Sequence, residues 1–74
     1  MGVLRVLNGH EEKKYLWESD SSIGCRIARE NFEYCVKRGF IAYKTLHQGK
    51  IGIPLTKFDS KADEIVMLKL ANGG

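Results

Sequence analysis

Residues 64–70 read EIVMLKL, and this stretch decides the fold class. Residues 65–68 form a continuous apolar run of strand length, without the polar alternation of a strand that is exposed on one face. Such a run is typical of a buried central strand. We therefore expect residues 64–70 to form the last strand of the chain and to lie at the centre of a sheet.

The start of the chain predicts a hairpin. Residues 3–7 and 13–18 are rich in strand-forming side chains, and Asn8-Gly9 between them is a strong signal for a two-residue turn. The loop can extend over residues 10–12, so the start of the second strand stays open. In the expected fold, the first strand of this hairpin lies beside the last strand of the chain.

Residues 23–38 predict one amphipathic helix. Residues 19–22 read SDSS and offer several N-cap side chains, while Gly39 offers the left-handed residue that ends a helix. Lys37 and Arg38 suit the negative end of the helix dipole. The expected apolar stripe consists of Ile23, Ile27, Ala28, Phe32, Cys35 and Val36.

The remaining elements complete an α+β pattern. Residues 40–46 and 51–58 predict two more strands, and Pro54 places the second of them at a sheet edge. The resulting order is β-β-α-β-β-β, a mixed sheet packed on one helix. We expect residues 1–70 to form a single domain and residues 71–74 to form a flexible tail.

Composition limits the classes of function. A chain of 74 residues forms one domain at most, and its net charge of +3 comes from basic residues interleaved with acidic ones. This pattern indicates a solvated surface, and nucleic-acid binding is not expected. No apolar run approaches the roughly 20 residues of a membrane span, and no signal peptide is evident. We expect a cytoplasmic monomer without membrane contact.

Two cysteines and two histidines are the residues most easily read as reactive or metal-binding. Ten helical residues, a rise of about 15 Å, separate Cys25 from Cys35, so a disulfide between them is excluded. Cys35 is expected in the core, and Cys25 lies off the apolar stripe and is expected to be partly exposed. His10 and His47 fall in predicted turns without partners at zinc-ligand spacing. We predict no metal site, no catalytic residues and no enzyme activity.

The end of the sequence resembles ubiquitin-like proteins of the β-grasp fold. Residues 63–74, DEIVMLKLANGG, share an acidic pair, an apolar strand and a Gly-Gly with the sulfur carriers of molybdopterin and thiamine biosynthesis. Residues 39–43 and 58–65 are also similar to prokaryotic ubiquitin-like proteins. One departure is that Lys69 and Leu70 stand where many molybdopterin-type carriers have two prolines.

The resemblance implies a substrate of an activating enzyme. In such proteins an E1-like adenylating enzyme uses ATP to activate the last carboxylate, here that of Gly74. Gly73 lacks a Cβ and lets the segment pass a narrow channel. Sulfur or a lysine amine then attacks, which makes the protein a sulfur carrier or a protein modifier. The implied partners are the activating enzyme and either a sulfur-accepting enzyme or target-protein lysines, and no cofactor is bound.

The last strand is also expected to carry a partner surface. Residues two apart in a strand face the same side, so Ile65 and Met67 share one face. By resemblance they pack on the helix, and the other face exposes an apolar patch beside the tail. A register error of one residue would reverse this assignment. The predicted partner-binding residues are Val66, Leu68, Lys69 and Leu70.

Two other functions stay open from the sequence. A β-grasp binding module that is never activated would act through its sheet face and would tolerate loss of Gly73-Gly74. A small basic nucleic-acid-binding protein would lose affinity steeply as salt is added. Sulfur transfer and protein conjugation use the same tail, so the sequence does not separate them.

Overall fold

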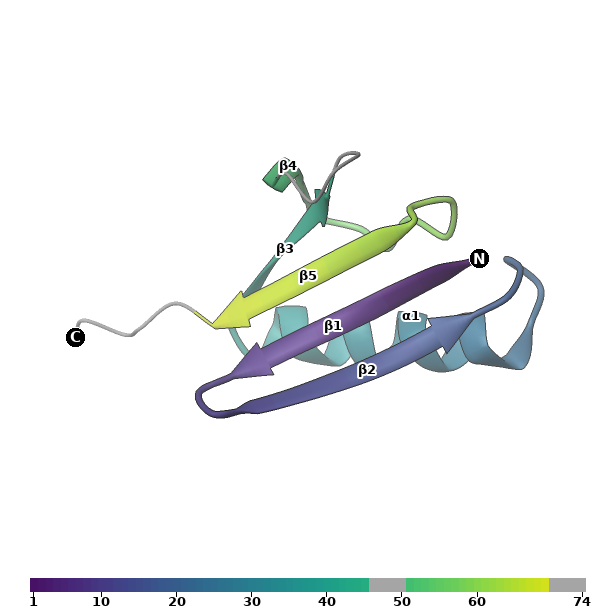
Figure 1. Ribbon diagram of the computed structural model, residues 1–74. Coiled ribbons are helices and arrows are strands. Elements are labelled where there is room, and N and C mark those ends of the chain that lie inside the picture. Colours follow the sequence, from purple (N-terminus) through teal and green to yellow (C-terminus); the bar gives the residue numbers. More distant parts are fainter. Residues whose placement is uncertain (46–50, 70–74) are drawn as a thin grey trace.

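The computed structural model describes residues 1–45 and 51–69 and shows an α+β fold with one helix and one mixed sheet (Figure 1). The order of strands and helix is the one predicted from the sequence. Helix α1 packs across one face of the five-stranded sheet. The elements are β1 (Gly2–Asn8), β2 (Glu11–Trp17), α1 (Ile23–Lys37), β3 (Phe40–Thr45), β4 (Ile51–Leu55) and β5 (Glu64–Lys69).

The last strand lies at the centre of the sheet, which confirms the prediction from its apolar run. The strand order is β2-β1-β5-β3-β4. β5 runs parallel to β1, with Leu4 beside Ile65, and antiparallel to β3, with Ala42 beside Met67. β4 is an edge strand, as predicted from Pro54.

The hairpin turn lies one residue later than the sequence suggested. Asn8 pairs with Glu11, so the loop consists of Gly9 and His10, and β2 begins at Glu11 instead of residue 13. Gly9 has a φ of 64°, a conformation that glycine adopts without a steric penalty. Because the glycine takes the first loop position, Asn8 stays paired in β1.

Both ends of α1 have the predicted caps. The Ser22 hydroxyl accepts a hydrogen bond from the Cys25 amide at 3.1 Å, which satisfies one free donor of the first turn. At the other end Gly39 has a φ of 94°, and its amide donates to the Val36 carbonyl at 3.1 Å. The helix therefore begins at the predicted residue and ends at Lys37, one residue early.

The buried face of α1 is rotated from the predicted one. Cys25 was expected to be partly exposed, yet it is 1% exposed. Ile23 and Ile27 were expected in the stripe, yet they are 77% and 44% exposed, and Val36 is also exposed. The residues that face the sheet are Cys25, Ala28, Phe32 and Cys35.

Gly24 accounts for this rotation. A Cβ atom on Gly24 would collide with the Leu16 carbonyl oxygen, so only glycine lets the helix backbone come this close to β2. With the Gly24 side of the first turn against the strand, Cys25 points into the core. Ile23 and Ile27 then point to solvent, on the opposite side of the helix.

The core is organised around the Trp17 side chain. Its indole Nε1 donates to the Ser60 carbonyl at 3.0 Å, which satisfies the polar atom of a ring that is 1% exposed. A Cβ atom on Gly2 would collide with this ring, so β1 must carry glycine beside it. The largest fully buried side chains are those of Trp17, Phe32, Leu4, Ile65, Met67 and Cys25.

The fourth strand is shorter than predicted. β4 ends at Leu55, whereas the sequence suggested a strand to Phe58. Phe58 leaves the sheet because its ring packs on the core: its centroid lies 5.0 Å from that of Trp17 and 5.7 Å from that of Phe32. The segment after β4 therefore packs against both α1 and Trp17 and covers the core between them.

Candidate functional site

The two faces of β5 differ in the way the sequence predicted. Ile65 and Met67 are 0% exposed and lie on the helix side of the sheet. Val66 and Leu68 are half-buried and lie on the other face, which no helix covers among the described residues. Their side chains therefore sit where the predicted partner surface requires them, and their role in binding stays a prediction.

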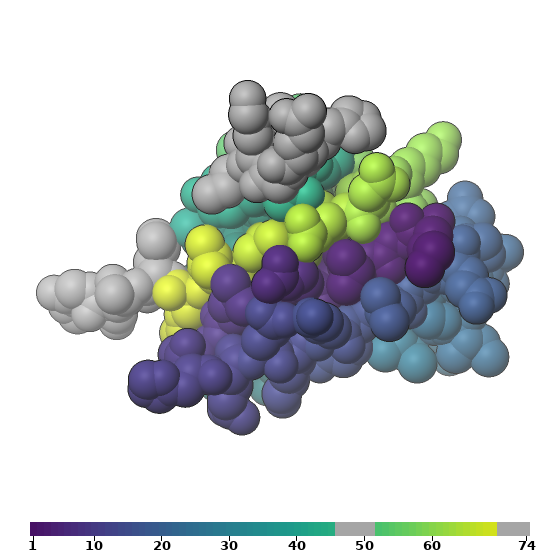
Figure 2. Space-filling view, viewed as in Figure 1, coloured from purple at the N-terminus to yellow at the C-terminus, as the bar shows by residue number. Residues whose placement is uncertain are grey.

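Neighbouring strands extend this face into an apolar patch. Leu68 lies between Leu7 of β1 and Ile41 of β3, and Val66 lies beside Tyr43 of β3. We call Leu7, Ile41, Tyr43, Val66 and Leu68 the outer patch. Figure 2 shows this face of the molecule, where the surface of β5 lies between those of β1 and β3. Large apolar patches on a protein surface usually mark interaction sites.

A charged network borders the outer patch on the β1 and β2 side. The Arg5 guanidinium lies 2.8 Å from the Glu12 carboxylate and 3.1 Å from that of Glu64. The hydrogen bond with Glu12, and then that with Glu64, raises the pKa of Arg5, and the Arg5 bond lowers the pKa of Glu12. The Thr45 hydroxyl also donates to Glu64 at 3.0 Å. This network holds fixed charges at one border of an apolar surface.

Lys69 is the last described residue and ends β5. Its side chain is exposed, and its Nζ atom lies 6.0 Å from the centre of the Phe40 ring. The other predicted residues of this site, Leu70, Gly73 and Gly74, lie outside the described residues, as does the predicted tail of residues 71–74.

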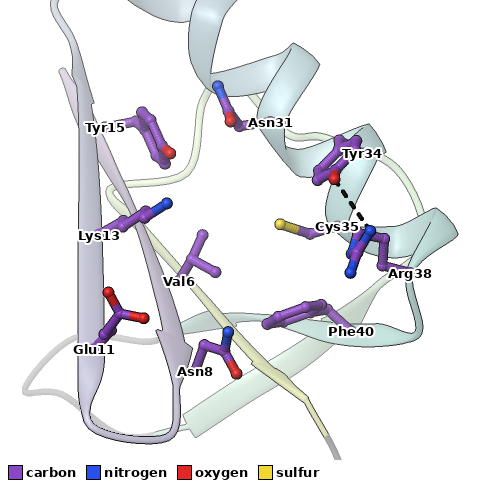
Figure 3. A pocket seen from close by; sticks show the side chains of 10 residues that line it. All are labelled: Val6, Asn8, Glu11, Lys13, Tyr15, Asn31, Tyr34, Cys35, Arg38 and Phe40. Atoms are coloured by element: carbon purple, nitrogen blue, oxygen red, sulfur yellow. Dashed lines mark hydrogen bonds between the residues drawn. The ribbon is translucent and has the colours of Figure 1, made fainter.

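A small hollow opens between the β1–β2 hairpin and the end of α1 (Figure 3). Its volume is about 140 Å³. Val6, Cys35 and Phe40 form the apolar part, and Arg38 stands at the rim, where it donates to the Tyr34 hydroxyl at 3.1 Å. A space of this size is well below that of ordinary ligand pockets.

Neither cysteine has the surroundings of a reactive thiol. Both are free and buried. Burial raises the pKa of Cys35, and the charges of Arg38 and Lys13 oppose this effect only in part. Nucleophilic cysteines require a lowered pKa and access to solvent, so the thiols are core side chains.

The described residues form neither a metal-binding cluster nor a membrane-spanning helix. Within residues 1–45 and 51–69, no group of three or more His, Cys, Asp or Glu side chains lies close enough to hold a metal ion. The one helix that these residues form is too short and too polar to cross a membrane.

Comparison with known proteins adds no relative. No family model, curated protein or solved structure matches this chain. The outer patch and the strand order are therefore the observations on which a functional assignment has to rest.

One feature that the sequence did not predict is a second, larger hollow. It has a volume of about 400 Å³ and lies between α1 and the segment 56–58. No local pattern could have revealed it, because it forms where Lys57 and Phe58 come against Arg29 and Phe32. Only the early end of β4 brings these residues together.

Proposed function

We propose that this chain is a ubiquitin-like β-grasp protein that is activated at the carboxylate of Gly74. The observation that carries the proposal is the strand order β2-β1-β5-β3-β4 with α1 on one face, which is consistent with a β-grasp arrangement. Gly73-Gly74 follows the central strand of this sheet by a few residues. The protein acts as a substrate in this proposal and has no catalytic residues of its own.

The outer patch supplies the docking step. An E1-like adenylating enzyme has to hold the folded domain while residues 70–74 enter its active site. Val66 and Leu68 lie on the sheet face that no helix covers among the described residues. Lys69 ends β5, but its side chain alternates to the helix side and lies over Phe40, so in this proposal it would contact the enzyme beside the entering segment and not through the outer patch. Docking by apolar burial would position the segment, and the small glycines would allow it to pass a narrow channel.

The chemistry after docking is acyl activation. The Gly74 carboxylate attacks the α-phosphate of ATP, pyrophosphate leaves, and the acyl adenylate becomes a good electrophile. A sulfur nucleophile that displaces AMP gives a thioester or thiocarboxylate, and a lysine amine that attacks the activated acyl group gives an isopeptide. The domain carries out sulfur transfer or conjugation in the cytoplasm, with ATP consumed by the enzyme.

The second candidate is a binding module that acts through the outer patch alone. The observation that favours it is the patch itself, because Ile41, Tyr43, Val66 and Leu68 form an apolar surface that needs no glycines to bind a partner. Deletion of Gly73-Gly74 separates the two candidates. The carrier would keep its fold and its affinity for the patch partner but would lose every ATP-dependent product, whereas the binding module would lose nothing.

A further inference from the structure

The larger hollow lies on the helix side of the sheet, away from the outer patch. It is a groove between the second half of α1 and the segment 56–58 that follows β4. Its volume of about 400 Å³ falls in the range of sites that bind part of a ligand or peptide. Its floor is apolar and its rim is charged, and these two features indicate the chemistry of the partner that it could bind.

The floor of the groove is formed by Phe32 and Phe58, which belong to a packed aromatic cluster with Trp17 behind them. Phe58 meets Phe32 edge to face, with an interplanar angle of 72°, and it meets Trp17 at 60°. Rings from β2, α1 and the segment after β4 thus hold one another in place. Val36 is 38% exposed and adds an apolar wall on the helix. The groove therefore offers a preformed apolar surface.

The rim carries more positive than negative charge. Arg29, Lys37 and Lys57 stand on it as exposed cations, and Glu33 is the one acid among its lining residues. None of these four side chains forms an ion pair within the described residues. The described acids that do pair are committed to cations elsewhere, namely Arg5, Lys14, Arg26 and Lys44.

Arg29 lies over the floor of the groove, where its guanidinium could bind a carboxylate. Its guanidinium carbon lies 5.7 Å from the centre of the Phe58 ring, so a cation–π contact restrains the long side chain over the floor. The Arg29 guanidinium forms no ion pair within the described residues, and a carboxylate can accept two of its N–H donors at once. Lys57, on the neighbouring segment, adds a second positive charge across the groove.

We propose that this groove binds an extended acidic segment of a partner protein. One aromatic or aliphatic side chain of the segment packs against Val36, which is 38% exposed. Adjacent carboxylates pair with Arg29 and Lys57, neither of which forms an ion pair within the described residues. The apolar floor beside an excess of positive charge is the complement of a peptide in which acidic and apolar residues alternate.

Nucleic acid fits the groove less well. Single-stranded nucleic acid needs exposed ring faces for its bases, but Phe32 is 1% exposed and the Arg29 guanidinium covers Phe58. The groove and the outer patch lie on opposite sides of the sheet, so both can be occupied at once. The inference therefore stands whether or not Gly74 is activated.

The test is a titration with a fluorescein-labelled peptide in which one phenylalanine and one leucine are flanked by glutamates. We expect saturable binding by fluorescence anisotropy, and amide chemical-shift changes confined to residues 29–37 and 56–58. The double variant Arg29→Gln, Lys57→Gln should bind roughly tenfold more weakly. The control Lys13→Gln, Lys61→Gln removes the same charge at exposed positions outside the groove and should change affinity less than about twofold.

Four results would overturn the proposal: no saturable binding, equal affinity for a peptide with glutamine in place of glutamate, shift changes confined to the outer patch, or tighter binding of a single-stranded oligonucleotide at the same salt concentration. Circular dichroism checks that each variant is folded. If the double variant unfolds, Val36→Glu replaces it. That change places an acid in the wall of the groove and should likewise weaken the peptide complex.

Discussion

Val66 of β5 lies directly beside Tyr43 of β3, and both face away from the helix. On the other side of Val66, the β1 neighbour is Arg5, which the Glu12 and Glu64 carboxylates hold. Beside Val66 the outer patch therefore ends at a charged residue on β1 and continues through Tyr43 on β3, while the Glu64–Thr45 hydrogen bond marks its polar end. A partner that buries this patch should approach over β5 and β3.

Substitutions along β5 should separate binding from folding. Val66→Asp should cost roughly 1 kcal/mol of unfolding free energy, because the side chain is half-buried on the uncovered face. Met67→Ala should cost about 2–5 kcal/mol, because that side chain is 0% exposed. Urea unfolding measures both free energies. Val66→Asp should stay folded and lose binding of the activating enzyme, whereas any folded Met67→Ala should keep it. If Val66→Asp destabilises the domain as much as Met67→Ala does, the outer patch is misassigned.

Gly2 should be intolerant of even a methyl group. Gly2→Ala places its Cβ into the Trp17 indole and should lower the free energy of unfolding by about 1–3 kcal/mol. The emission maximum of Trp17 should shift to longer wavelength, because the displaced indole becomes more exposed to water. Gly39→Ala is the control, because it strains a positive φ without meeting any atom within 4 Å. An unchanged Trp17 spectrum in Gly2→Ala would contradict the packing.

Stability should fall in acid. The pKa of Asp59 is lowered because the Lys61 amide and then the Lys44 ammonium hydrogen-bond its carboxylate, and the pKa of Glu12 is lowered chiefly by Arg5. A carboxylate whose pKa is lower in the folded state stabilises the fold above its unfolded pKa. That contribution is lost as the pH falls through the folded pKa.

The decline should therefore begin below the ordinary values, which are 4.5 for Glu12 and 3.8 for Asp59. Thermal unfolding over a pH series measures it, and Asp59→Asn should make the decline shallower. The control is Asp63→Asn, at an exposed carboxylate without an ion pair among the described residues. An acid decline in Asp59→Asn as steep as that of the unaltered chain would rule out the assignment to this carboxylate.

Both cysteines should resist modification in the folded state. Cys25 is 1% exposed and Cys35 is 8% exposed, and burial raises the pKa of Cys35. Alkylation with iodoacetamide, followed by mass spectrometry, should be slow in buffer and rapid in urea for both thiols. Rapid labelling of Cys25 in buffer would instead support the partly exposed position that its place in the sequence suggested.

The sequence predicted the order of elements because each carried its own local signal. The apolar run at residues 65–68 indicated a central strand, Pro54 indicated an edge, and Ser22 and Gly39 capped the helix. The alternation of side chains along β5 also placed Val66 and Leu68 on the same face, and the resemblance to ubiquitin-like proteins predicted that this face points away from the helix. These features depend on neighbours within a few residues, so one sequence suffices for them.

The predictions were wrong where contacts between residues distant in the sequence determine the structure. The rotation of α1 depends on the close approach of Gly24 to Leu16, which turns Cys25 inward and Ile27 outward. The early end of β4 depends on Phe58 packing against Trp17. The groove on the helix side depends on the second of these effects, which brings residues 56–58 against α1, so no spacing in the sequence could have indicated it.

The most direct test of the central claim is the intact mass of the protein after incubation with ATP, an E1-like adenylating enzyme and a sulfur source. The account predicts an ATP-dependent change that requires Gly74. A gain equal to the replacement of one oxygen by sulfur identifies a sulfur carrier, and a covalent adduct on another protein identifies a modifier. An unchanged mass with a free Gly74 carboxylate, across the E1-like enzymes encoded in the same genome, would contradict the account and favour the binding module.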